Sequence, residues 1–294
     1  MGPTRFELVT SSLSGTRSNQ LSYEPGQWRE GFYVCDFACQ FIRRHGGGWF
    51  LTDGETATKD EPMAATFSVL LLTAAPPAHA TESGGPFVKI DGREALLRSA
   101  ELFLNRPEVK QIQIVFPEDG WEEYKRKFGG HLGFSGVKLL SGASRWIDQM
   151  AVGAKSIAEE ATHVIVHDTA RPAVAYSDLD NLVAAAEKHP VVVLTSPLKA
   201  NLIEVDEAAH PVAYHQATNF VQLLSPQCYR KDKFIQAATN KQEPHASEMT
   251  LVKGSPLNVR CSGPGDASYM KSLLNHLPKP KAKGPLTPFE EAQW

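Results

Sequence analysis

The sequence predicts an α/β protein with a mostly parallel sheet, helices on both faces and a β arm. Three observations support this prediction. From residue 66 onward, apolar runs of strand length alternate with segments that carry apolar residues at helical spacing. Helix-length segments between strands are typical of βαβ units, which build parallel sheets. The alternation is interrupted once, between Pro197 and Gln227, by short extended pieces, and this segment is the predicted arm.

The first half of the domain alternates regularly. The continuous apolar run over residues 66–75 predicts a buried strand, and the apolar spacing over 93–106 predicts a helix. The alternating pattern over 109–117 predicts a second strand. A helix over 119–130 is expected to end at its glycine pair, Gly129-Gly130, ahead of a short strand over 136–140.

The second half continues the same alternation. A helix over 144–161 precedes the apolar strand 163–167, and Ser177 is the expected N-cap of the next helix, 177–189. Valine-rich residues 190–197 predict the strand that leads into the arm. After the arm, the same reasoning predicts a helix over 231–241, a strand over 256–262 and a closing helix over 266–277.

Composition divides the chain into three parts. Residues 1–62 lack any sustained period and are expected to be either a disordered extension or a spurious one, with Met63 as the native start. Residues 63–278 form the predicted domain, and its arm, over about 198–224, either pairs with a second subunit to form a homodimer or is a lone hairpin flap. The Pro/Lys-rich residues 279–294 are expected to be a flexible tail.

Charge and cysteine content exclude several classes of protein. The chain has 30 basic and 33 acidic side chains, a net charge of -3, so nucleic acid is not an expected partner. Four irregularly spaced cysteines indicate a reducing, cytoplasmic compartment, and no function is expected for the Cys35/Cys39 pair. No apolar run approaches the roughly 20 residues of a membrane helix. The stretch after Met63 is similar to a secretion signal, but no cation precedes its apolar centre, which favours a strand.

The stretch THVIVHDTARPAV, residues 162–174, places Asp168 and Arg171 just after a predicted strand. Ligands of open α/β sheets bind beyond the carboxyl ends of the strands. A carboxylate there can hold Mg²⁺, and an arginine fork matches phosphate oxygens, so the pair suits a phosphorylated substrate. The alternative is a turn cap with a surface ion pair. His167 alternates to the other face and is expected to be a core histidine.

Five motifs resemble those of the methylerythritol-phosphate cytidylyltransferases, enzymes of non-mevalonate isoprenoid synthesis, over about residues 66–278. The segment VHDTARP is similar to their signature VHDAARP. In the other four motifs, the similarity rests on Gly142 and Arg145, on Pro226 and Gln227 with Ser225 in place of a threonine, on Glu248 and Thr250, and on Asn258, Pro264 and Asp266 with Arg260 in place of a lysine. The resemblance implies a Rossmann-like, GT-A-like nucleotidyltransferase fold with a dimer arm supplied in trans. It also implies transfer of a cytidylyl group from CTP to a sugar-alcohol phosphate, with Mg²⁺ and release of pyrophosphate.

The resemblance assigns a role to each candidate residue. The expected catalytic residues are Asp168, which also binds the metal, Arg260 and Lys89. The acceptor phosphate and its sugar-alcohol are expected to contact Arg171, Asn201, Ser225 and Glu248. The nucleotide is expected to contact Ala74, Ala75, Gly84, Gly85, Gly142, Arg145 and Asp148.

Departures from the family pattern fall on the nucleotide loop. The family has a glycine-rich AAGxGxRM loop followed by PKQ, whose amides and cations cradle the triphosphate. Here Pro76 and Pro77 remove two amide donors, and Phe87 stands at the lysine position, with Lys89 as the nearest replacement. Losing cations from a phosphate site lowers the rate, so the alternative function is a non-catalytic, dimeric nucleotide-binding or scaffold protein.

Overall fold

The computed structural model describes residues Arg44–His45, Gly48–Trp49, 64–82 and 84–278. Its contacts divide the chain into one unit over Met1–Pro62 and another over Met63–Trp294. In the first unit, β1 (Arg44–His45) pairs antiparallel with β2 (Gly48–Trp49). The remainder of the 1–62 extension, with Cys35 and Cys39, and the 279–294 tail lie outside the described residues, so both stay predictions.

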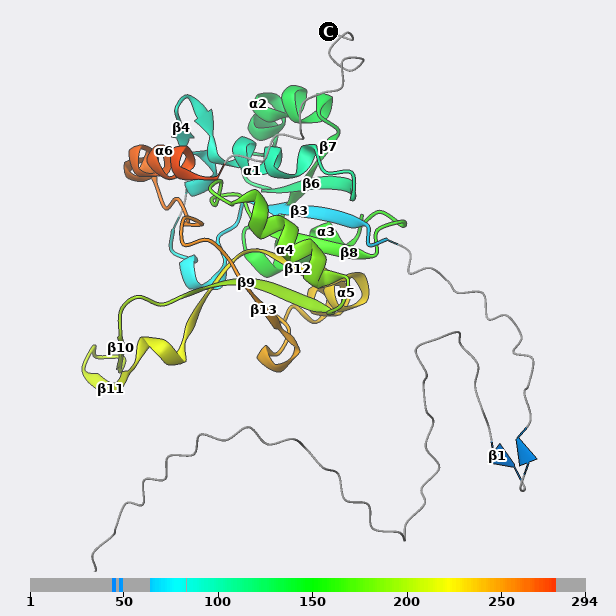
Figure 1. Cartoon of the computed structure of the whole chain (residues 1–294). Coiled ribbons are helices and arrows are strands. Elements are labelled where there is room, and N and C mark those ends of the chain that lie inside the picture. Colours follow the sequence, from blue (N-terminus) through cyan, green and yellow to red (C-terminus); the bar gives the residue numbers. More distant parts are fainter. Residues whose placement is uncertain (1–43, 46–47, 50–63, 83, 279–294) are drawn as a thin grey trace, which may run out of the picture. The chain divides into compact units, whose positions relative to one another are not determined.

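A central sheet organises the second unit (Figure 1). Its seven strands lie in the order β13-β9-β12-β8-β3-β6-β7. In chain order they are β3 (Phe67–Leu72), β6 (Val109–Pro117), β7 (Val137–Gly142), β8 (His163–Asp168), β9 (Val191–Pro197), β12 (Val221–Arg230) and β13 (Thr250–Lys253). Only β12 runs antiparallel to its neighbours in this sheet, β8 and β9. The mostly parallel sheet is therefore confirmed.

Alternation along β3 separates two apolar cores. Val69 and Leu71 belong to one cluster and Leu70 and Leu72 to the other, and all four are fully buried. Helices α1 (Ala95–Leu104), α2 (Trp121–Phe134) and α4 (Tyr176–Ala186) contribute to the first cluster, and α3 (Trp146–Ala154) and α5 (Lys231–Asn240) to the second. Burying one such leucine stabilises the fold by about 1.5–3 kcal/mol. Helices on both faces are thus confirmed.

Smaller elements surround the sheet. Helix α6 (Ala267–His276) packs with the strand β4 (Lys89–Ile90) in a third apolar cluster, and β4 pairs with β5 (Arg93–Glu94). Short 3₁₀ turns are η1 (Pro77–His79), η2 (Gly85–Phe87), η3 (Ala217–Asn219), η4 (Ala246–Glu248) and η5 (Pro264–Asp266). Among the residues that the structure describes, no helix is long and apolar enough to cross a lipid bilayer.

Some predicted helix ends are wrong. The helix expected over 144–161 already ends at Ala154, as α3, and residues 155–161 form turns and irregular chain. Gly129 and Gly130 lie inside α2, which continues to Phe134, and the chain turns at Gly136 with φ of +74°. A glycine ends a helix where it adopts positive φ, and Gly129 and Gly130 do not. Helix α4 is capped by Ala175, so Ser177 lies within its first turn instead of preceding it.

The strand predicted over 256–262 is also wrong. These residues form irregular chain, and the edge strand β13 lies a few residues earlier, parallel to β9. Leu257, Val259 and Cys261 alternate because they pack on the α6 cluster, not because they pair in a sheet. Two hydrogen bonds hold the segment to the chain after β8: Cys261 N–H to the Ala170 carbonyl, and the Arg171 guanidinium to the Asn258 carbonyl, each 2.8 Å.

The predicted arm forms a β-hairpin. Strands β10 (Leu202–Val205) and β11 (Pro211–His215) pair antiparallel between β9 and β12, and they project beyond the sheet (Figure 1). All four residues of β10 are exposed. The hairpin lies within the predicted range of 198–224, but Val221–Leu223 already pair with β9 in the central sheet.

Candidate active site

Asp168 lies at the carboxyl end of β8, beside Leu72 at the end of β3. This is the edge at which open α/β sheets bind ligands. Its carboxylate accepts the Ala170 N–H at 3.0 Å, and its carbonyl accepts the Arg171 N–H at 3.0 Å. These local bonds turn the chain directly after the strand. As a result, Arg171 folds back beside Asp168.

Four charged side chains meet there, and we call them the Asp168 cluster: Glu82, Asp168, Arg171 and Arg260. Asp168 Oδ2 lies 2.9 Å from Arg260 Nε and 3.7 Å from Arg171 Nε. Arg260 Nη1 also pairs with the Glu82 carboxylate. Asp168 is fully buried, and Arg171 and Arg260 are only 4% and 6% exposed. The structure thus brings together Asp168, Arg171 and Arg260, three of the candidate residues from the sequence.

Burial governs protonation in this cluster. Complete burial raises the pKa of Asp168, and the charges of Arg260 and Arg171 oppose that shift. Burial lowers the pKa of Arg171, and Asp168 counteracts it. Each charge is therefore tolerated because its partner is present, and removing one would leave the other buried without compensation.

Ser225 attaches β12 to the cluster. Its hydroxyl oxygen accepts the Asp168 N–H at 2.8 Å and lies 2.9 Å from His167 Nδ1. Burial lowers the pKa of His167 to about 3, so the imidazole is neutral at physiological pH. His167 is fully buried, as expected for a core histidine.

Two cavities flank the Asp168 cluster. The loop cavity, of about 670 Å³, is lined by Ala74, Ala75, Glu82, Gly84, Arg145 and Arg260 together with Phe87, Tyr124 and Trp146. The strand cavity, of about 240 Å³, is lined by Pro76, Pro77, Asp168, Arg171, Ser225, Gln227 and Glu243, among others. Arg260 faces the first cavity and Arg171 the second. The two guanidiniums can therefore bind different phosphate groups.

Gln149, which the sequence analysis did not identify, holds the start of the nucleotide loop. Its side-chain oxygen accepts the N–H groups of Thr73 and Ala74 at 3.1 and 3.0 Å, and its amide donates to the Ala143 carbonyl at 2.9 Å. Gln149 is fully buried. An amide on the apolar face of a predicted helix is the signal that could have found it, since buried polar groups need partners.

The three candidate glycines differ in environment. Gly84 lines the loop cavity with φ of +88°, a conformation that favours glycine. A Cβ on Gly85 would lie 2.1 Å from the Cys261 carbonyl oxygen, and one on Gly142 would lie 2.8 Å from Val152. Gly85 and Gly142 are therefore required for close packing, and neither lines the two cavities.

Arg145 and Asp148 form an ion pair at the rim. Arg145 lines the loop cavity, its side chain is 75% exposed, and its guanidinium lies 2.6 Å from Asp148. Asp148 also pairs with Lys241 at 2.8 Å, and hydrogen bonds from Lys241 and Arg145 lower its pKa. Asp148 lines neither cavity beside the cluster.

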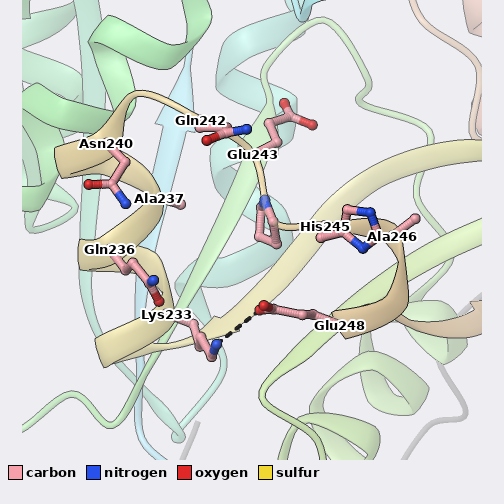
Figure 2. Close-up of a pocket in the computed structure, with 10 residues that line it drawn as sticks. Lys233, Gln236, Ala237, Asn240, Gln242, Glu243, His245, Ala246 and Glu248 are labelled. Carbon is pink, nitrogen blue, oxygen red and sulfur yellow. Dashed lines mark hydrogen bonds and ion pairs between the residues drawn. The ribbon is translucent and has the colours of Figure 1, made fainter.

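Three other candidates lie outside both cavities. Lys89 is exposed on β4, which gives no support to its expected role beside the triphosphate. Asn201 is exposed on the arm, where its side chain accepts the Ala217 N–H at 2.9 Å. Glu248 pairs with Lys233 at 2.9 Å and lines a separate polar cavity of about 460 Å³ between α5 and residues 242–248 (Figure 2).

The Asp168 cluster can supply only part of the coordination of a metal ion. Among residues 64–82 and 84–278, no group of three or more His, Cys, Asp or Glu side chains forms a metal site. Asp168 offers a single carboxylate, and both of its oxygens already accept hydrogen bonds. Mg²⁺ is commonly held by one or two carboxylates with substrate phosphates as further ligands. Asp168 can serve as that one carboxylate.

Known structures share this fold. The 4-diphosphocytidyl-2C-methyl-D-erythritol synthase of Anaerococcus prevotii aligns with a TM-score of 0.59 and 15% identity, over 72% of this chain and 97% of that one. The 2-C-methyl-D-erythritol 4-phosphate cytidylyltransferase of Thermus thermophilus aligns with a TM-score of 0.55 and 19% identity, over 70% of this chain and 98% of that one. At these identities the comparison establishes a shared fold.

Sequence comparison establishes the family. The curated 2-C-methyl-D-erythritol 4-phosphate cytidylyltransferase of Vibrio atlanticus is 32% identical over 207 residues, which cover 64% of this chain and 86% of that protein. The enzyme of the same name from Rhodopirellula baltica is 25% identical over 234 residues, 72% of this chain and 96% of that protein. The family model described as "IspD: 2-C-methyl-D-erythritol 4-phosphate cytidylyltransferase" matches residues 69–267. The chain therefore belongs to the 2-C-methyl-D-erythritol 4-phosphate cytidylyltransferase family.

Proposed function

We propose that the protein transfers a cytidylyl group from CTP to 2-C-methyl-D-erythritol 4-phosphate, with release of pyrophosphate, in isoprenoid precursor synthesis. The observation that carries the proposal is the family match over residues 69–267, within which Asp168, Arg171 and Arg260 meet at the ligand-binding edge of the sheet. The comparisons do not support the alternative of a non-catalytic scaffold.

The cavities support a division of roles. The nucleotide occupies the loop cavity, where Ala74, Ala75, Gly84 and Arg145 surround it and Arg260 faces its phosphates. The acceptor phosphate binds at Arg171 and Ser225 in the strand cavity. One acceptor oxygen attacks the α-phosphorus, the bond to the β-phosphate oxygen breaks, and pyrophosphate leaves. The protein contributes mainly alignment of the two substrates and positive charge.

Asp168 would hold Mg²⁺ together with the phosphates of the nucleotide. When bound, the ion neutralises charge on the phosphates. The protein acts as a homodimer in which the arm supplies Asn201 to the neighbouring site. Glu248, at the cavity of Figure 2, keeps no assigned contact with either substrate in this proposal. The cytoplasmic location stays a prediction that rests on the cysteine content.

A pyrophosphate-release assay tests the proposal. The full chain is incubated with Mg²⁺, CTP and 2-C-methyl-D-erythritol 4-phosphate, and release is expected only when all three are present. ATP, GTP and UTP serve as matched controls for the nucleotide, and erythritol 4-phosphate for the acceptor. Absence of release, together with no heat on calorimetric titration with CTP and Mg²⁺, would overturn the assignment.

A further inference from the structure

Glu82 forms an ion pair with the guanidinium of Arg260, which faces the loop cavity. Its carboxylate pairs with Arg260 Nη1, while the other carboxylate oxygen lies 2.9 Å from His79 Nδ1. Burial opposes its ionisation, but hydrogen bonds with His79 and Ser262 and the charge of Arg260 outweigh burial and lower the pKa of Glu82. Glu82 is therefore an anion at neutral pH, and it lies where a phosphate would contact Arg260.

The segment that carries Glu82 is anchored on both sides. On one side, the Ala74 N–H donates to Gln149 at 3.0 Å. On the other, Gly85 is wedged against the carbonyl of Cys261, the residue after Arg260. Glu82 itself is 29% exposed at its side chain, far more than the 3% of Arg260. The anchors fix the ends of the loop, and Glu82 lies between them as the most exposed member of the cluster.

The charge balance of the Asp168 cluster indicates that the Glu82 carboxylate stands in the place of a phosphate. Two carboxylates, Glu82 and Asp168, face two guanidiniums, Arg171 and Arg260, so the cluster is neutral as it stands. Asp168 is fully buried and fixed by the Ala170 N–H, whereas Glu82 borders the loop cavity. Moving Glu82 aside leaves a net positive charge at the cavity wall. Arginine binds a phosphate oxygen with the same donors that bind a carboxylate.

We propose that Glu82 competes with the phosphate of the ligand for Arg260 and occupies this guanidinium in the free protein until an anion displaces it. Glu82 therefore sets the affinity for phosphate. This inference rests on the proposed function only in naming the natural anion as a nucleotide phosphate; the competition itself concerns any pyrophosphate-like anion. Glu82 is a positioning residue, because it acts through Arg260.

Calorimetric titration with inorganic pyrophosphate tests the competition directly. E82Q keeps the shape of the side chain but removes its charge, so pyrophosphate is expected to bind about tenfold more tightly than to the unaltered chain, the size of one charge-assisted hydrogen bond. E82A deletes the group entirely and is expected to show the same gain. Agreement of the two variants separates loss of the carboxylate from any effect of the new amide.

D91N is the matched control. Asp91 pairs with Lys271 at 2.8 Å on the surface, so D91N removes the same charge from the chain without contacting Arg260. Asp91 has a φ of +53°, a conformation that asparagine also tolerates. Pyrophosphate affinity within twofold of the unaltered chain is expected for D91N. Equal or weaker binding by both Glu82 variants, including no heat with any protein, would overturn the proposal.

The assay also separates this inference from the proposed function. Pyrophosphate binding requires no turnover. A chain that fails to use CTP but binds pyrophosphate more tightly after E82Q would refute the activity and support the competition. A chain that turns over CTP with no change in pyrophosphate affinity after E82Q or E82A would support the activity and refute the competition.

Discussion

At the scale of single residues, the site depends on compensated charge. Asp168 has no exposed surface and two guanidiniums within 4 Å, at 2.9 and 3.7 Å. Breaking a buried ion pair by removing one partner destabilises a protein by about 3–5 kcal/mol, because the remaining charge is left in a poorly polarisable interior. The same residues are thus expected to serve both the stability of the fold and the proposed binding of phosphate.

Replacing Asp168 by Asn tests this dependence. The amide keeps the size of the side chain but leaves Arg260 and Arg171 without their shared carboxylate. We expect the free energy of unfolding to fall by about 3 kcal/mol or more. Turnover is expected to fall by about 100-fold or more, because the proposed phosphate site loses its proposed metal ligand. Urea unfolding and the pyrophosphate-release assay measure the two effects.

D178N provides the comparison. Asp178 is also a buried carboxylate, and its pKa is raised by burial, which outweighs a hydrogen bond from the Ser255 N–H. That bond is 2.7 Å long, and an asparagine oxygen can accept it equally well. The expected loss for D178N is below about 1 kcal/mol. If D168N and D178N lose stability equally, charge compensation at Asp168 is not the cause.

At the scale of elements, local pattern predicts most of the sheet and fails at its edge. Strands β3 and β8 are apolar runs that are buried on both faces, so their hydrophobicity alone identifies them. Strand β13 is four residues long with every second residue exposed, which leaves almost no signal. The wrong strand over 256–262 has the period of a strand, but its apolar residues pack on α6. Apolar residues at every second position show that alternate side chains are buried. They do not show whether a sheet or a helix covers those side chains.

In the candidate site, too, the sequence predicts some of the residues and misses others. Asp168 and Arg171 are predictable because they follow an apolar strand directly, and Arg260 because its motif resembles a family motif. Glu82 and Gln149 contact partners 178 and 76 positions away in sequence, Arg260 and Thr73 respectively. A local pattern can mark Gln149 as a buried amide, but it does not identify the partner of either residue, since these contacts exist only after the sheet has formed.

Close packing between α3 and β3 yields an element-scale prediction. A Cβ on Gly153 would lie 2.3 Å from Leu70 Cδ1, and Leu70 is fully buried at the centre of the sheet. We expect G153A to lower the free energy of unfolding by about 1–3 kcal/mol, because the helix must move away from the strand. Urea unfolding of the two proteins measures this change.

G130A is the matched substitution in another helix. Gly130 lies inside α2, and a Cβ there would meet nothing within 4 Å. Alanine is the better helix former, so G130A is expected to stabilise the protein by about 0.5–1 kcal/mol. The two changes have opposite signs because alanine clashes with a neighbour at position 153, whereas at position 130 only its better helix propensity counts. Equal effects of G153A and G130A would show that the α3–β3 contact relaxes freely.

At the scale of the whole molecule, the arm leaves an apolar surface uncovered. Ile203 pairs with Tyr214 across the hairpin, and Val205 and Val212 lie beside the register shift that follows Glu204. These four side chains are 55%, 60%, 54% and 63% exposed, respectively. An isolated two-stranded hairpin is marginally stable in water. A second copy of the chain would cover this face, which is the basis for the proposed homodimer.

Charge placed on that face should separate the subunits. I203E puts a carboxylate where the second copy would bury isoleucine. We therefore expect light scattering to give twice the mass of one chain for the unaltered protein and the mass of one chain for I203E. I235E is the control, because Ile235 is 41% exposed on α5, away from the hairpin, and should leave the dimer intact. An unaltered protein that is monomeric, or an I203E variant that stays dimeric, would mean that the arm does not join two subunits.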